Sequence, residues 1–221
     1  MKILVFDTET AGKALRWSPA EVDRDAWPAL LQLSAKLIEV DLDNVFKPFK
    51  IIYDFNSYVL PFRGEQAVEI HPDAQKVHNI TFDHCVENGN DIATVSLLFQ
   101  GLLNTADILV AHNFFFDRNV MTAEMLKANI PPKAKGGSRT FCTMQYNTDV
   151  LKLPNPKKPG TNKYPSLSET YKHYFNQNMS EVFNAHDSNE DVGATLSIFV
   201  KMLQVDEKLV EKLKSNEKKL Y

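Results

Sequence analysis

Four acidic residues and one histidine, spread over three short segments, have the types and spacing of a metal site. They are Asp7, Glu9, Asp117, Asp191 and His186. The first two segments each follow an apolar run, residues 2–6 and 108–111, which predicts buried strands that end in carboxylates. Carboxylates beside an apolar interior are costly unless positive charge neutralises them, and hard divalent cations such as Mg²⁺ or Mn²⁺ prefer carboxylate oxygens. We therefore interpret the three segments as one dispersed cation site.

Several carboxylates on one small patch suit the hydrolysis of a phosphodiester. The negative charge of the ester repels a nucleophile and its leaving oxygen is a poor one, and two cations roughly 4 Å apart address both problems. Asp7 and Glu9 leave the same face of an extended segment because they are two residues apart. Imidazole titrates near neutrality, so His186, on the loop before a helix that carries Asp191, is a candidate general base.

Each of these residues also has a plain structural alternative. Asp7 and Glu9 could be solvated acids at a strand end. Asp117 could be a helix acid favoured by the macrodipole, in a helix that Asn113 is expected to cap. His186 could be an ordinary histidine of a surface loop. The occurrence of all three segments in one chain favours metal binding over these alternatives.

The remaining polar residues of the second and third segments are assigned to structure. Ser188 is a plausible N-cap, and with Asp191 it resembles a capping box, which is compatible with metal binding. His112 is expected to support the turn from strand to helix. Asp187 and Glu190 are expected to be solvated or to lie behind the ligands.

The three segments resemble the three motifs of the DEDDh, or DnaQ-like, 3′–5′ exonuclease family. That family includes proofreading subunits of bacterial replicative polymerases, RNase T and oligoribonuclease. The matching motifs are Asp7-x-Glu9, Asn113-x-x-Phe116-Asp117 and His186-x-x-x-x-Asp191. Segments between the motifs also resemble the family in the expected order: Trp27-Pro28, Gln32-Leu33, 77–81, 141–143 and 166–168. The resemblance covers residues 1 to about 203.

The resemblance implies a metal-dependent 3′–5′ exonuclease that acts on single-stranded ends, with DNA favoured, and releases nucleoside 5′-monophosphates. It implies two divalent cations, Mg²⁺ or Mn²⁺, held by Asp7, Glu9, Asp117 and Asp191. Asp7 would bridge the two ions and His186 would deprotonate the attacking water. The residues expected to contact substrate are Thr8, Thr10, Asp73, His78, Asn113 and Phe116.

Two other functions remain as alternatives. A catalytically silent domain on the same scaffold could bind nucleic acid or dock on a polymerase, although the complete set of acids and histidine argues against silence. A phosphatase with an aspartyl nucleophile would begin Asp-x-Asp, and Glu9 stands in place of the second Asp. The resemblance is compatible with a homodimer and with a polymerase as partner. It leaves proofreading, repair and RNA turnover open as biological roles.

Composition limits the class of protein. A chain of 221 residues is long enough for one α/β domain with a sizeable core. Neither a membrane span nor a secretory signal is expected, and Cys85 and Cys142 are expected to be free thiols in a reducing cytoplasm. The net charge of −3 argues against a general nucleic-acid coat protein. Residues 132–172 nevertheless carry eight cations and only two acids, which suits either a polyanion guide or a solvated lysine-rich loop.

The hydrophobic pattern predicts an α/β protein in which helices pack on the faces of a mixed sheet. The family resemblance implies an RNase H-like fold, with a mixed five-stranded sheet and helices on both faces. Strands are expected at 2–8, 30–40, 51–60, 108–111 and 139–143, although 30–40 could also be a helix. Helices are expected at 72–78, 91–103, 114–128, after 143, at 166–175 and at 191–203. Residues 154–165 hold four prolines and a glycine and are expected to form a loop.

The domain is expected to occupy residues 1–205, followed by a charged helical tail at 206–221. Leu209, Val210 and Leu213 would give that tail a narrow apolar face. Such a face could cap the domain, or it could dock on a partner.

Overall fold

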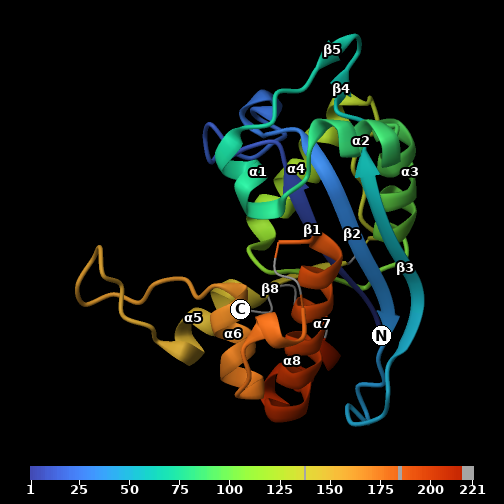
Figure 1. Cartoon of the computed structure of the whole chain (residues 1–221). Coiled ribbons are helices and arrows are strands. Elements are labelled where there is room, and N and C mark those ends of the chain that lie inside the picture. Colours follow the sequence, from blue (N-terminus) through green and yellow to red (C-terminus); the bar gives the residue numbers. More distant parts are fainter. Residues whose placement is uncertain (137, 184–185, 216–221) are drawn as a thin grey trace.

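A six-stranded mixed sheet runs through the molecule, in the order β6-β3-β2-β1-β7-β8 (Figure 1). The computed structural model describes residues 1–136, 138–183 and 186–215. The strands of this sheet are β1 (Lys2–Thr10), β2 (Leu30–Glu39), β3 (Lys50–Val59), β6 (Gly89–Asn90), β7 (Ile108–Ala111) and β8 (Arg139–Cys142). β1, β2 and β3 are antiparallel neighbours, and β7 and β8 continue the sheet parallel to β1.

Helices cover both faces of the sheet, as the sequence predicts for an RNase H-like fold. One face carries α3 (Ile92–Leu103) and α4 (Phe114–Lys127), together with the short 3₁₀ helix η1 (Arg24–Ala26). The other carries α7 (Ser188–Val205), against which the remaining C-terminal helices pack. These are α5 (Thr143–Leu151), α6 (Leu167–Phe175), η2 (Met179–Glu181) and α8 (Glu207–Lys214). Two short helices, α1 (Pro72–His78) and α2 (Phe82–Asn88), follow β3.

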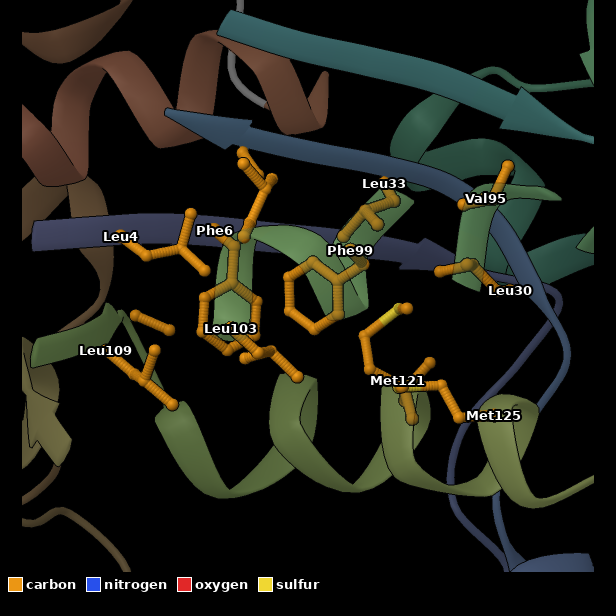
Figure 2. Packing of buried hydrophobic residues seen from close by; sticks show 14 of the residues in the cluster. Leu4, Phe6, Leu30, Leu33, Val95, Phe99, Leu103, Leu109, Met121 and Met125 are labelled. Atoms are coloured by element: carbon orange, nitrogen blue, oxygen red, sulfur yellow. The ribbon is translucent and has the colours of Figure 1, made fainter. Parts of the chain in front are cut away.

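Strand β1 is apolar on both faces because each face meets a separate core. Leu4 and Phe6 pack with Phe99 of α3 and Met121 of α4 (Figure 2). Ile3 and Val5 belong to the opposite cluster, which includes α7. A continuous apolar run of this kind is typical of a strand buried on both sides. The segment 30–40, which was ambiguous between strand and helix, is strand β2 for the same reason, since Leu33 lies in one core and Ile38 in the other.

The five expected strands are confirmed, but the sheet has a sixth. β6 is only two residues long and pairs with Tyr58 and Val59 at the end of β3. A second, two-stranded sheet also went unpredicted: β4 (Phe62–Arg63) and β5 (Gln66–Ala67) form a hairpin. Strands of two residues show no hydrophobic period, so pattern analysis cannot find them.

Helix α8 packs on the domain through its apolar face. Leu209 and Leu213 are 2 % and 0 % exposed and lie in the same core as α7, with Val210 packed against it. Arg139 of β8 is buried and donates hydrogen bonds to the carbonyl oxygens of Lys212 and Leu213. The described part of the expected tail therefore caps the domain, and residues 216–221 lie outside the described chain.

Two smaller expectations can also be compared with the structure. Both cysteines are buried, and Cys85 is a free thiol, as expected. Among the described residues, no helix is long and apolar enough to cross a membrane.

Candidate active site

The C-terminal half of β1 forms the floor of the site. β1 pairs with β7 only from Ile3 to Val5, and β7 ends at Ala111. Beyond this point β1 still pairs with β2 through Asp7 and Glu9. Because these two residues alternate with buried Thr8, their half-buried carboxylates project from one face of the sheet, where β1 extends past β7.

Asp117 reaches this part of β1 from the first turn of α4. It is 3 % exposed, and its Oδ1 accepts two hydrogen bonds from Thr8, one from the backbone N–H at 3.1 Å and one from the hydroxyl at 2.8 Å. The two bonds hold this carboxylate near Asp7, where its charge adds to the rise that burial causes in the pKa of Asp7. The hydroxyl of Thr8 thus orients Asp117, and its contact with substrate stays a prediction.

Asn113 joins β7 to α4 in a different way from the one predicted. Its φ is +74°, in the left-handed region that asparagine tolerates better than most residues, and its side chain makes no capping hydrogen bond. An N-cap side chain normally reaches the helix from extended backbone, so the left-handed turn explains why this cap is absent. The turn instead brings α4 back across the end of β7, which places Asp117 beside β1.

The N-terminus of α7 supplies the third segment of the site. Asp187, and not the predicted Ser188, is the N-cap residue, and its side chain accepts a hydrogen bond from the N–H of Asn189 at 2.9 Å. Ser188 is the first helical residue and is fully buried, with its hydroxyl 2.6 Å from that of Ser34 on β2. The prediction of a Ser188 cap was wrong because this hydroxyl bonds across to the sheet. Asp191 lies in the first turn of the helix.

His186 lies on the turn before α7, as the spacing to Asp191 predicts. It is exposed and has a φ of +68°, and its N–H donates to Asp191 Oδ2 at 3.3 Å. One ligand atom of each of Glu9, His186 and Asp191 lies within 4.8 Å of the other two. The histidine and two of the acids therefore meet at one point, although they come from opposite ends of the chain.

The carboxylates share a poorly solvated pocket, which raises the pKa of every one of them. Burial raises the pKa of Asp7 well above its usual value, and the charges of the neighbouring acids add to the rise. Burial raises the pKa of Glu9 to about 8, with Asp191 adding to the shift. The pKa of Asp117 rises to about 7, although the hydrogen bonds from Thr8 oppose the effect of burial. The pKa of Asp191 rises to about 6, mainly through burial.

This arrangement fits divalent cations. Asp191 Oδ1 is buried and has no hydrogen-bond partner in the described part of the chain, although a buried carboxylate oxygen normally has one. The available donors are four carboxylates and one imidazole, and carboxylate oxygens are the ligands that Mg²⁺ and Mn²⁺ prefer. Positive charge placed among them would offset the repulsion that raises their pKa values.

Polar side chains of β2 and β3, which the sequence analysis did not assign, support the site from behind. Gln32 lies opposite Glu9 and Ser34 opposite Asp7 in the β1–β2 register, and both are fully buried. Ser34 donates to Asn56 at 2.9 Å, and the Gln32 amide lies 3.4 Å from Asp187 Oδ1. These contacts anchor the first turn of α7 on the sheet. A detectable signal did exist, since three polar residues, Gln32, Ser34 and Lys36, interrupt the apolar pattern of 30–38.

The other predicted substrate residues differ in how close they lie to the acids. His78 is buried at the end of α1, with Nε2 3.2 Å from the carbonyl oxygen of Thr10 and Nδ1 accepting from Ile80 N–H. Burial lowers its pKa, the hydrogen bond with Thr10 opposes this effect, and the charge of His186 lowers the pKa further. The Thr10 hydroxyl donates to Gly12.

Asp73 lies in the first turn of α1 and is exposed. Its described contacts are with His71, whose ring nitrogen accepts from the Asp73 N–H. The structure therefore does not bring Asp73 to the four acids, and its contact with substrate stays a prediction.

Phe116 belongs to an aromatic group beside the site. Phe115 stacks on Trp17, with ring centroids 6.1 Å apart, and Phe116 meets Trp27 edge to face at 5.8 Å. Phe114 is buried against Phe6, as expected for at least one of three successive phenylalanines. Phe116 keeps partial exposure, which is compatible with the predicted contact to a nucleobase.

His112 has the structural role that the sequence analysis gave it. Its Nδ1 lies 3.0 Å from the Thr143 hydroxyl and its Nε2 3.1 Å from the carbonyl oxygen of Pro165. Burial lowers its pKa to about 4, so the ring is neutral near pH 7. His112 thus ties the end of β7 to the first residue of α5 and to the loop before α6.

Comparisons with known proteins agree with this geometry. The profile of a family described as exonuclease, named for RNase T, matches residues 4–199. The fold is similar to that of E. coli Exonuclease I in complex with a dA16 oligonucleotide, with a TM-score of 0.71 and 17 % identity. It is also similar to the zinc-bound Exonuclease I–ssDNA complex from the same organism, with a TM-score of 0.70 and 17 % identity. Curated protein sequences gave no match.

The similarity to these structures covers nearly the whole chain but less than half of the relatives. In both cases 97 % of this chain aligns with 43 % of the Exonuclease I chain. At this level of identity the likeness establishes the fold.

Proposed function

The chain belongs to the family of 3′–5′ exonucleases, and from this premise we propose that it hydrolyses the terminal phosphodiester of single-stranded nucleic acid, with DNA as the favoured substrate. The products would be nucleoside 5′-monophosphates. The observation that carries the proposal is the gathering of Glu9, His186 and Asp191 within 4.8 Å of one another, next to half-buried Asp7 and buried Asp117. The preference for DNA is supported by the oligonucleotide complexes of the structurally similar Exonuclease I.

In the proposed mechanism, Asp7, Glu9, Asp117 and Asp191 would together hold two divalent cations. When bound, two such ions supply positive charge that activates water and stabilises the departing oxygen. Thr8 keeps Asp117 in its ligating orientation through the two hydrogen bonds already described. The anchoring of α7 by Gln32 and Ser34 does the same for Asp191.

His186 is proposed as the general base. Its position on an exposed turn beside Glu9 and Asp191 lets the imidazole approach a water aimed at the phosphorus, accept its proton and release that proton to solvent. Thr10, His78, Asn113 and Phe116 are proposed to position the terminal nucleotide. A catalytically silent domain would not need to maintain a set of mutually repelling buried carboxylates, so the enzyme is the better reading of the site.

Replacing the proposed base tests this function directly. We expect His186→Ala to lower kcat on a labelled single-stranded oligonucleotide by about 10²–10⁴-fold, the usual contribution of a general base. Mn²⁺ affinity, measured by calorimetry, should change little because the carboxylates remain. His173→Ala, on the exposed side of α6, is the matched control and should keep full activity.

Two outcomes of this experiment would count against the proposal. Unchanged hydrolysis by His186→Ala would remove the base assignment while leaving the exonuclease in place. Failure of the unmodified protein to hydrolyse single-stranded DNA, single-stranded RNA or dinucleotides with either cation would remove the function itself.

A further inference from the structure

A lysine-rich arm projects from the domain between α5 and α6. Residues 152–165 leave the body of the molecule and return to it (the gold loop in Figure 1). This arm contains four lysines and no acidic residue. It differs in this respect from the protein as a whole, which has a net charge of −3. A solvent-exposed arm with charge of one sign buries little apolar surface, so stability of the core does not explain its sequence.

The arm has a fixed backbone despite its exposure. Its two limbs are joined by hydrogen bonds from Asn155 N–H to the Thr161 carbonyl at 2.9 Å and from Lys163 N–H to the Leu153 carbonyl at 2.8 Å. Gly160, with a φ of +80°, allows the chain to turn at the tip. Four prolines restrict the arm further. Binding a ligand would therefore cost little further conformational entropy in the arm, because its backbone is already ordered.

Most of the positive charge on the arm is not neutralised by the protein. Lys163 binds Glu169 at 2.5 Å. The described residues place no acidic side chain within 4.0 Å of the amino groups of Lys152, Lys157 and Lys158, all of which are exposed. Tyr164, next to Lys163, is 62 % exposed. Exposed lysines beside an exposed aromatic ring form the combination that binds single strands, through phosphates and stacked bases.

The base of the arm is hydrogen-bonded to the segment that leads from β7 into α4. Pro165, its last residue, accepts a hydrogen bond from Nε2 of buried His112 at 3.1 Å. His112 directly precedes Asn113, where the chain turns into the helix that carries Asp117. The base of the arm and the helix that carries Asp117 therefore both meet the end of β7 at adjacent residues, His112 and Asn113.

We propose that the arm binds the phosphate backbone of the strand being degraded, several nucleotides from the bond that is cut. This inference rests on the proposed function and extends it, since it gives the enzyme a second contact with long substrates. Lys157 and Lys158 bind phosphates, and the ring of Tyr164 stacks on a base. Binding is independent of sequence because each contact is to a phosphate or to the face of a base.

The salt dependence of binding measures these contacts. Each phosphate neutralised on a single strand contributes about 0.7 to the slope of log affinity against log salt concentration. The double substitution Lys157→Ala/Lys158→Ala should therefore reduce that slope by about 1.4. The readout is the anisotropy of a labelled single-stranded 20-mer, titrated with the full chain in EDTA, so hydrolysis does not interfere. The matched control is Lys208→Ala/Lys212→Ala on α8, which removes the same charge from exposed positions and should leave the slope unchanged.

Two further measurements separate this proposal from general charge effects and from the proposed function. Tyr164→Leu should weaken binding of the 20-mer by about fivefold or more without changing the salt slope, since it removes one stacking contact with a base and no charge. With Mg²⁺, the arm variant should lose kcat/KM on the 20-mer and keep it on a dinucleotide, which is too short to reach the arm. Hydrolysis of the dinucleotide by the unmodified protein tests the chemistry independently of the arm.

The arm proposal is overturned if the Lys157/Lys158 variant and the unmodified protein have the same salt slope, or if the α8 control loses as much as the arm variant. Equal slopes combined with normal dinucleotide hydrolysis would leave a solvated loop, or a docking site for an acidic protein, on a working exonuclease.

Discussion

At the scale of single residues, the four carboxylates that are proposed to bind cations also lower the stability of the metal-free protein when they are ionised. Burial and mutual repulsion raise the pKa values of Asp7, Glu9, Asp117 and Asp191. A group whose folded pKa is raised stabilises the protein fully below its unfolded pKa, and that stabilisation is lost as the pH rises through its folded pKa. The site should therefore make the metal-free protein less stable as the pH increases from about 4.5 to about 8.

The isosteric substitution Glu9→Gln tests this effect. In EDTA, the Tm of the unmodified protein should fall between pH 5 and pH 8, because only the unfolded chain gives up the Glu9 proton readily in that interval. The Gln variant has no proton to lose at this position, so its Tm should fall less over the same range. Thermal unfolding followed by circular dichroism measures both.

The control for this experiment is Glu65→Gln in the exposed turn of the β4–β5 hairpin, which should reproduce the pH profile of the unmodified protein. If Glu9→Gln and the unmodified protein lose equal Tm between pH 5 and pH 8, the Glu9 carboxyl is not perturbed by the pocket.

At the scale of elements, the short β6 strand shows how closely backbone segments pack around the site's scaffold. A Cβ on Gly89 would lie 2.3 Å from the carbonyl oxygen of Cys85 and 2.6 Å from the Leu60 nitrogen. Both are backbone atoms, so no rotamer change can relieve the overlap. Gly101, on the exposed side of α3, has no atom within 4 Å of the corresponding position.

The two glycines give a matched pair of alanine substitutions with opposite expected signs. Gly89→Ala should destabilise the protein by about 1–3 kcal/mol, because the backbone of β6 must shift to admit the methyl group. Gly101→Ala should stabilise it by about 0.5–1 kcal/mol, since alanine is the better helix former. Urea denaturation measures both changes in the free energy of unfolding. A neutral Gly89→Ala would mean that β6 is not packed as closely as its geometry indicates.

The elements also show which parts of the structure the sequence could predict. The long strands and helices were predictable because their apolar residues repeat with a fixed period, and α1 was found from its proline in the first turn. The conformation of Asn113 and the hydrogen bond of Ser188 were not predictable, because local capping rules consider only the residues next to a helix end. In the structure, one adopts a left-handed turn and the other bonds across to Ser34.

The site was predictable in the same uneven way. Asp7, Glu9, Asp117, Asp191 and His186 were found because their types and spacing are set by the chemistry. The supporting contacts of Thr8 and Gln32 depend on which strands are neighbours and in what register. That information is tertiary, and it appears in the sequence only as unexplained polar residues within an apolar strand.

At the scale of the whole molecule, α8 is packed against the rest of the domain. Its buried Leu213 and the hydrogen bonds from Arg139 connect it to the core on the α7 face. The domain boundary near residue 205 stays a prediction, and in the described chain α8 packs in the same core as α7.

Introducing a charge into this contact tests whether α8 is part of the fold. Leu213→Asp should lower the free energy of unfolding by about 2–5 kcal/mol, because it removes a buried leucine and places an acid in the same space. Lys208→Asp, on the exposed side of the same helix, should change it by no more than about 0.5 kcal/mol. If urea denaturation gave equal midpoints for the two variants, α8 would be a loosely attached tail.

The placement of the carboxylates has one more consequence for the whole molecule. Asp117 belongs to a helix on one face of the sheet and Asp191 to a helix on the other, and β1 holds Asp7 between them. Cations bound by these three carboxylates would join three layers whose hydrophobic clusters are otherwise separate, and a chelator could remove them. Removing the cations should therefore loosen the packing of the layers on one another before the layers themselves unfold. The geometry of the active site would then be lost at a lower temperature than the secondary structure.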